Sequence, residues 1–210
     1  MKKLALFLSL ILAITFTYAQ DEYQNNEIQT IFSKRKSNGA YGAFTVSYSE
    51  IGGRDALVTG GRGAFIFDHS FAIGLGGFGF VNNLDYHSTN NNEFEYSLAG
   101  GYGGIFIEPI IAGRSPVHLS FPILIGMGGV SLFENYGWDY WDQHLPTSNF
   151  GTDVFFVVEP AVELEFNLVR FFRVAATASY RHTSKIELLD TNEDVLRGFN
   201  FGMTFKFGKF

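Results

Sequence analysis

Large apolar side chains alternate with small or polar residues along the C-terminal segment of the chain. Phe199, Phe201, Met203, Phe205 and Phe207 occupy every second position, and Asn, Gly, Thr and Lys separate them. A β-strand places successive residues on opposite faces. This segment therefore predicts a strand with one aromatic face and one small or polar face.

The same alternation recurs from residue 39 onward and predicts eight strands. Enrichment in β-branched and aromatic residues places them near 39–49, 56–67, 71–81, 94–107, 117–132, 153–167, 171–183 and 197–208. The connections 68–70, 112–116 and 168–170 are short, whereas 49–55, 82–93, 134–152 and 184–196 are longer. Short turns at one end and long loops at the other are typical of an up-and-down outer-membrane β-barrel.

Charged residues of the predicted strands fall on the face opposite the apolar residues. An Arg or Lys that faces lipid at mid-depth costs about 2–4 kcal/mol, so we expect these charges to face the lumen. There they would form a salt-bridge network made of Arg62, Glu159, Glu163, Glu165, Arg173, Arg181 and Lys206. Eight strands leave room only for side chains, which predicts a filled lumen.

Two features of the strands depart from the regular alternation. In 94–107 the glycines at 100–101 and 103–104 obscure the alternation, so neither the faces of this strand nor the side of Glu108 is assigned. The Glu-Pro pairs at 108–109 and 159–160 lie on predicted strands. Because proline cannot donate to the hydrogen-bond ladder, we expect bulges there.

The first residues of the chain predict export. Lys2 and Lys3 precede an apolar run from Leu4 to Phe16, and small residues follow up to Ala19. This pattern indicates a signal peptide over 1–19 that is cleaved, and it is too short for a spanning helix. The polar stretch 20–37 then predicts a periplasmic lead before a barrel over 38–210.

Composition narrows the possible functions. Removal of the signal peptide leaves 13 basic and 21 acidic residues, a net charge of −8, which disfavours nucleic acid as a partner. Cysteine is absent, so neither disulfides nor a cysteine-linked lipid anchor can be argued from these residues. The glycines at 60–63 and 74–79 do not open a helix after a strand, as a phosphate-binding loop would, so no cofactor is expected.

Strand number, signal peptide, short turns and a terminal Phe together resemble the small outer-membrane barrels of the OmpA-transmembrane and OmpX type. The Gly-Gly-Arg-Gly-Ala and Ser-Phe-Ala-Ile-Gly-Leu-Gly-Gly stretches, with the Glu-Pro strands, resemble uncharacterised barrels of Bacteroidetes-type bacteria. The resemblance covers about residues 39–210 and implies a place in the cell outer membrane. Phe205, Phe207 and Phe210 resemble the terminal signal read by the barrel-insertion machinery, although Phe210 is out of phase with the other two.

A catalytic candidate lies at the end of the seventh predicted strand. His182 could activate Ser184 as a nucleophile, with Glu187 or Glu193 orienting the imidazole ring. The pair resembles the His-x-Ser-Asn motif of the lipid A deacylase family, but Lys185 stands where that family has Asn. The alternative is an interfacial His beside a Ser that begins a loop, and this is the interpretation adopted, so no enzyme is expected.

Both tryptophans lie in the connection 134–152. Tyr136, Trp138, Tyr140 and Trp141 indicate an aromatic girdle at the outer interface, or side chains that stack on an extracellular ligand. Asp139, Asp142 and His144 could bind a divalent cation, but the girdle is the preferred interpretation and no metal is expected.

These observations favour an integral outer-membrane barrel with a structural or interactive role. Its expected partners are outer-membrane lipid, the barrel-insertion machinery and an extracellular ligand or protein bound through the loops. Three alternatives stay open: a lipid-modifying barrel enzyme, an accessory barrel of a transport or secretion system, and a soluble lipocalin-like barrel with its aromatic residues inside.

Overall fold

The computed structural model describes residues 38–82, 95–135, 149–188 and 192–210. The predicted signal peptide and periplasmic lead lie outside these residues, as does most of the connections 82–93 and 134–152. Within the described ranges, no helix is long and apolar enough to cross a membrane.

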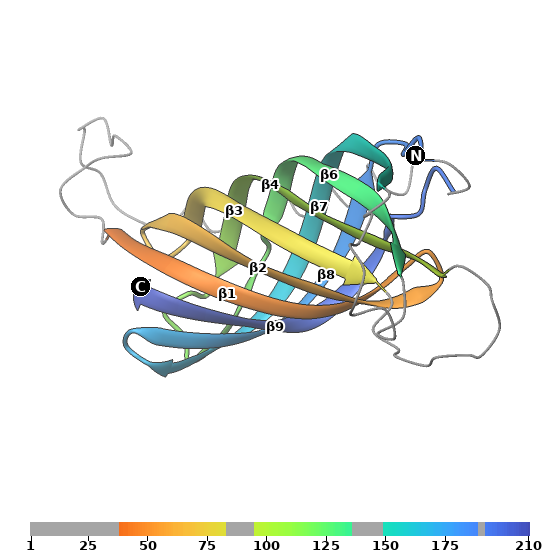
Figure 1. Ribbon diagram of the computed structural model, residues 1–210. Helices are drawn as coiled ribbons and strands as arrows, with labels where there is room; N and C mark the ends of the chain where they lie inside the picture. The colour runs from red at the N-terminus through yellow and green to blue at the C-terminus, as the bar shows by residue number, and fades with distance from the viewer. Residues whose placement is uncertain (1–37, 83–94, 136–148, 189–191) are drawn as a thin grey trace, which may run out of the picture. The chain divides into compact units, whose positions relative to one another are not determined.

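The described residues form nine antiparallel strands in one sheet. The strands are β1 (Asn38–Ile51), β2 (Arg54–Phe67), β3 (Phe71–Asn82), β4 (Glu95–Ile111), β5 (Val117–Ser120), β6 (Ile123–Asn135), β7 (Asn149–Val169), β8 (Phe172–Thr183) and β9 (Gly198–Lys209). Consecutive strands pair with each other, except that β5 and β6 each pair with β4 and β7. β1 pairs with β9 from Ala40↔Lys209 to Ser49↔Asn200. The sheet therefore closes into a barrel (Figure 1).

The fifth predicted strand is present as two pieces, β5 and β6. Both pair with β4 on one side and β7 on the other, and the register is the same before and after Phe121 and Pro122. The two pieces are thus one barrel strand, and the prediction of eight barrel strands is confirmed.

The predicted bulges at the Glu-Pro pairs are wrong. The pairings show no register shift at Pro109 or Pro160, and shifts occur instead near Phe133 and Val169. The ladder is interrupted at Pro122, where Phe121 N donates to Pro109 O at 2.9 Å and Ala161 N donates to Pro122 O at 2.7 Å. At Pro109 and Pro122 the carbonyl oxygen accepts a hydrogen bond from the neighbouring strand. The sheet therefore accommodates these prolines without the additional residue that a bulge would insert.

The prediction of a long connection at 49–55 is also wrong. β1 and β2 extend through it and leave only Gly52 and Gly53 between them. Both have positive φ, 65° and 74°, which is the backbone that a two-residue type I′ hairpin turn requires. The end with longer connections therefore has one tight turn.

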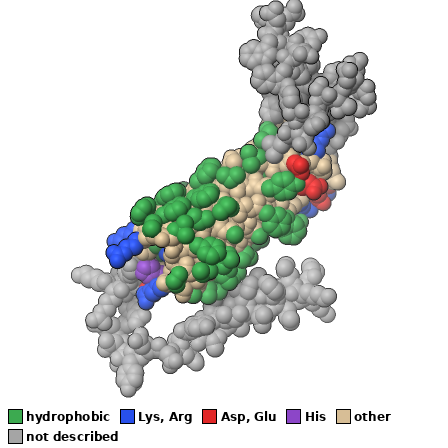
Figure 2. All heavy atoms as spheres, turned by 90° about the horizontal axis from the view of Figure 1, so that it is seen from below, with side chains coloured by type: hydrophobic (Ala, Val, Ile, Leu, Met, Phe, Trp, Pro, Cys, Tyr) green, Lys and Arg blue, Asp and Glu red, His purple; other side chains and the backbone are tan. Residues whose placement is uncertain are grey.

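The alternation places an apolar face outside and turns the charged side chains of the strands inside. Phe65, Leu75, Val154 and Phe156 are all more than 65% exposed, whereas Glu163, Glu165 and Lys206 are at most 1% exposed. Green apolar side chains cover much of the barrel flank in Figure 2. The soluble alternative required the reverse arrangement, with aromatic residues enclosed and charges outside, so the barrel has the inside–outside order of a membrane protein.

The strand that could not be assigned from sequence has no slip in phase. Leu98, Tyr102, Phe106, Glu108 and Ile110 are all buried, so the even-numbered residues of β4 face inward from Leu98 to Ile110. Glu108 therefore belongs to the lumen.

Candidate functional site in the barrel lumen

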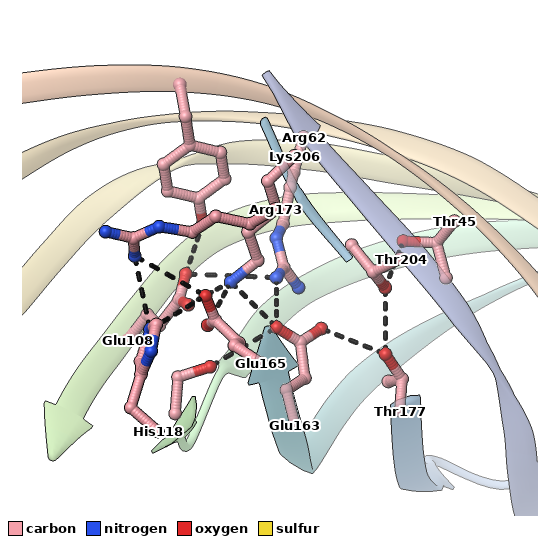
Figure 3. Close-up of polar contacts among 12 residues, drawn as sticks. Thr45, Arg62, Glu108, His118, Glu163, Glu165, Arg173, Thr177, Thr204 and Lys206 are labelled. Carbon is pink, nitrogen blue, oxygen red and sulfur yellow. Dashed lines mark hydrogen bonds and ion pairs between the residues drawn. The ribbon is translucent and has the colours of Figure 1, made fainter. Parts of the chain in front are cut away.

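A cluster of charged side chains fills the lumen near the end that carries the short turns. Arg62 projects from β2, Glu108 from β4, His118 from β5, Glu163 and Glu165 from β7, Arg173 from β8 and Lys206 from β9 (Figure 3). All seven are buried. They meet because each occupies an inward position on its strand, and the closed sheet turns these positions toward one axis.

Lys206 is the centre of the cluster. Its Nζ lies 2.5 Å from Glu108 Oε1, 2.8 Å from Glu163 Oε2 and 2.6 Å from Glu165 Oε1. Arg62 Nη2 donates to Glu163 Oε2 at 2.6 Å, which gives Glu163 a second cation. Hydroxyl groups complete the shell, since Ser120 and Thr177 both donate to Glu163.

Arg173 and His118 border the cluster on the side of Glu165. Arg173 Nη1 lies 3.5 Å from Glu165 Oε2, and His118 Nε2 lies 3.1 Å from the same oxygen. Arg173 and His118 are also adjacent to each other, with 3.2 Å between Arg173 Nη1 and His118 Nε2. Each of the three carboxylates therefore has at least one buried cation within ion-pair distance.

The balance of charge explains how the interior tolerates these groups. Three carboxylates, Glu108, Glu163 and Glu165, face three permanently basic side chains. An unpaired buried charge costs several kcal/mol, whereas a paired and hydrogen-bonded one is largely compensated. The three carboxylates could by spacing hold a cation, with ligand atoms within 4.8 Å of one another. The Lys206 ammonium takes that position, and the arrangement is an internal ion-pair plug.

Aromatic rings cover the plug at the short-turn end. The Tyr41 hydroxyl donates to Glu108, and the Tyr41 ring stacks on Phe210 with 6.0 Å between ring centroids. Arg173 Cζ lies 3.8 Å from the Phe210 centroid, a cation–π geometry. Of the residues that resemble an assembly signal, Phe207 is exposed on the outer face, Phe205 is half-buried, and Phe210 packs over the lumen.

Glu159 and Arg181 do not join the cluster. Glu159 accepts hydrogen bonds from Tyr102 Oη at 2.6 Å, Ser179 Oγ at 2.5 Å and Asn200 Nδ2 at 2.9 Å. Arg181 Nε donates to Leu196 O at 2.6 Å. Among the described residues neither forms an ion pair, so the structure divides the seven sequence-predicted lumen charges into a group of five and two separate residues.

A small cavity separates the two polar regions. Its polar lining includes Thr45, Ser47, Arg62, Glu159, Glu163 and Asn200. The Nε of Arg62 and the Oδ1 of Asn200 are buried without a protein partner. Such a donor and acceptor facing a polar cavity are typical of a site for ordered water.

The connection between β8 and β9 fills the opposite mouth of the barrel. Ile186, Leu188 and Leu196 are buried in a core that includes Ile51 and Phe80, with further members Val58, Leu98, Leu132 and Val157. Hydrogen bonds across the connection stabilise it, since Ile186 N donates to Glu193 O and the Arg197 side chain donates from Nε to Thr183 O. The sequence predicted a loop at 184–196, but not that it would enter the barrel.

The catalytic candidates are not arranged as a catalytic group. His182 is exposed on the outer face of β8, and Ser184 Oγ accepts a hydrogen bond from Phe156 N at 3.1 Å. Glu193 pairs with Lys185, and the Lys185 pKa is raised by this hydrogen bond and charge. Glu187 contributes its backbone N–H to Asp153 Oδ2 at 2.6 Å. In the described part of the chain, neither acidic residue contacts His182.

The aromatic loop residues Tyr136, Trp138, Tyr140 and Trp141 lie outside the described residues, as do Asp139, Asp142 and His144. Glu108 and His118 belong to the lumen cluster, but the sequence interpretation did not include them. The alternation could have indicated both. Glu108 follows the apolar Ile107, and His118 lies between the apolar Val117 and Leu119.

Comparison with known proteins supports the fold. The chain is similar to the Neisserial surface protein A structure, at 10% identity and a TM-score of 0.53 over 84% of this chain and 100% of that one. Two further matches are the N-terminal β-barrel domain of Pseudomonas aeruginosa OprF and the attachment invasion locus protein Ail of Yersinia pestis. Their identities are 13% and 12%, with TM-scores of 0.47 and 0.42, and they cover 81% and 83% of this chain and 96% and 98% of theirs. No family model and no curated protein matches the chain. The likeness to the first protein shows the fold, that of a small outer-membrane β-barrel.

Proposed function

We propose that this protein is an integral outer-membrane β-barrel whose lumen is closed and whose role is structural or interactive. The observation that carries the proposal is the separation of side chains by face. Apolar residues form the exposed flank, while Glu108, Glu163, Glu165 and Lys206 are enclosed. This distribution is stable in lipid, because an apolar flank carries no hydrophobic cost there. The charges stay inside the barrel, where they pair with one another and avoid contact with lipid.

The closed interior favours an interactive role over conduction. The ion-pair plug occupies the lumen near the short turns, and Ile186, Leu188 and Leu196 occupy the other mouth. The segments left for recognition are the predicted loops 82–93 and 134–152, which are rich in Asn, Asp, Glu and aromatic residues. Export through a cleaved signal peptide over 1–19 completes the proposal.

Gel mobility of the membrane fraction tests the membrane placement. A folded outer-membrane barrel resists detergent, so the unboiled protein should migrate differently from the boiled protein and should be found with the outer membrane. Recovery in the soluble periplasmic fraction without a mobility shift would overturn the proposal.

Two functional alternatives have direct tests. If the protein conducts ions as an accessory transport barrel, purified wild-type protein should open steps of current in planar bilayers, and we expect none. If it modifies lipid, cells that express Ser184→Ala should differ from wild type in the acyl number of extracted lipid. We expect identical profiles, because Ser184 Oγ accepts a hydrogen bond from the Phe156 backbone N–H and Glu193 pairs with Lys185 rather than with His182.

A further inference from the structure

The two ends of the barrel carry opposite charge. Figure 2 shows basic side chains at one end, and acidic side chains together with some basic ones at the other. At the short-turn end the described exposed charges are Arg114, Arg170 and Lys209, with Asp68 as the only acidic residue described there. At the opposite end the acidic residues Glu50, Asp55, Asp153, Glu187, Glu193 and Asp194 accompany Arg54, Lys185 and Arg197.

The three basic residues stand where the apolar flank ends. Arg114 lies in the turn between exposed Ile111 and Val117, and Arg170 lies between exposed Val169 and Phe171. Lys209 follows exposed Phe207 on β9. In a bilayer the edge of an apolar belt coincides with the headgroup region, where long basic side chains extend from the hydrocarbon toward lipid phosphates.

Among the described residues, these three basic side chains have few acidic partners. Arg114 has one acidic neighbour, Asp68, at 3.8 Å, and the Arg114 side chain is 78% exposed. Among the described residues, no ion pair involves Arg170 or Lys209. This contrasts with the other end, where Lys185 pairs with Glu193 and Arg197 pairs with Asp194 at 2.7 Å.

We propose that the short-turn rim, defined as Arg114, Arg170 and Lys209, binds the anionic headgroups of phospholipids in the adjacent leaflet. The proposal rests on the membrane placement proposed above. Charge complementarity identifies the occupant. Three exposed cations lie where the apolar flank ends, and two of them, Arg170 and Lys209, have no ion pair among the described residues. On a chain that is acidic overall, they favour a phosphate-bearing lipid with net negative charge. The acidic residues at the far rim disfavour the same lipid there, so the attraction is specific to one leaflet.

The test compares stability in two kinds of vesicle. Wild-type protein and the triple variant Arg114→Gln, Arg170→Gln, Lys209→Gln are folded into phosphatidylcholine vesicles and into mixed phosphatidylcholine and phosphatidylglycerol vesicles. Urea unfolding is then followed by gel mobility. Near an anionic surface each basic residue is expected to shift the folded-to-unfolded ratio about fivefold. Wild type should therefore gain more stability from phosphatidylglycerol than the triple variant, and high salt should remove the difference.

Single variants supply the control. Arg170→Gln should lose part of the response to phosphatidylglycerol, whereas Lys185→Gln, an exposed lysine at the other end, should not. If the triple variant responds to phosphatidylglycerol as strongly as wild type, the rim does not bind anionic lipid. Failure of wild-type protein to fold into phosphatidylcholine vesicles would instead contradict the membrane placement, so the two failures are distinguishable.

Discussion

At the scale of the residue, Lys206 compensates the negative charge of the buried glutamates in the lumen. Lys206→Met leaves Glu108, Glu163 and Glu165 with too few cations, and we expect the free energy of unfolding to fall by about 3–5 kcal/mol, as when one partner of a buried ion pair is removed. Urea unfolding followed by gel mobility measures the change.

Two variants make this prediction specific to the internal charge. Lys206→Met combined with Glu108→Gln removes one charge of each sign and should recover part of the lost stability. Lys185→Met removes an exposed ion pair and should leave the unfolding midpoint unchanged. Equal midpoints for wild type and Lys206→Met would mean that the ion pairs do not support the fold.

Inward and outward glycines should also respond differently to substitution. A Cβ at Gly126, which faces inward, would lie 2.0 Å from Gly103 O of the neighbouring strand, whereas at outward Gly79 the nearest atom is 3.8 Å away. Gly126→Ala should therefore destabilise the barrel by about 1–3 kcal/mol, the usual range for overpacking. Gly79→Ala should unfold at the wild-type urea concentration. Equal midpoints for the two variants would contradict the assignment of faces.

At the scale of the element, the connection between β8 and β9 behaves as part of the core. Leu196 is fully buried, and its carbonyl accepts from Arg181. Leu196→Asp would bury a charge in an apolar cluster, so we expect the connection to leave the mouth. Limited trypsin digestion should then cut after Lys185 and Arg197 faster than in wild type. Asn192→Asp, at an exposed position of the same connection, should keep the wild-type rate, and an unchanged Leu196→Asp pattern would contradict the packing.

The strands were predictable because each repeats a two-residue pattern, and the structure differs where that pattern is weak. Glycine has no side chain to indicate a face, so the direction of Glu108 on β4 could not be inferred across 100–104 although it follows directly from Leu98 and Tyr102. Ile186, Leu188 and Leu196 are few apolar residues in a polar connection, and local pattern does not reveal the barrel mouth that they enter. The two-residue pattern shows which charges face the lumen, but their partners depend on how the strands align in the barrel. This alignment separates Glu159 and Arg181 from the other predicted charges.

At the scale of the whole molecule, the lipid-facing flank should govern assembly. Phe201 and Val158 are exposed on the outer face. An Arg that faces lipid costs about 2–4 kcal/mol at the membrane midplane and less toward the interfaces. Phe201→Arg or Val158→Arg should therefore reduce the heat-modifiable band of the outer-membrane fraction. Glu187→Arg, at an exposed position beyond β8, should assemble normally. Assembly of all three variants at wild-type levels would show that the flank does not face lipid.

The pairing of β1 with β9 makes the order of strands circular. Lys209 O lies so close to Gly39 that a Cβ there would be 2.1 Å away, which shows how tightly the first and last strands meet. A short linker from Phe210 to Asn38, with new chain ends opened in the turn 112–116, would preserve every strand pairing of the barrel. Such a circular permutant should give the same heat-modifiable band as the parent, since the lumen and the flank depend on which strands are neighbours and not on which is synthesised first.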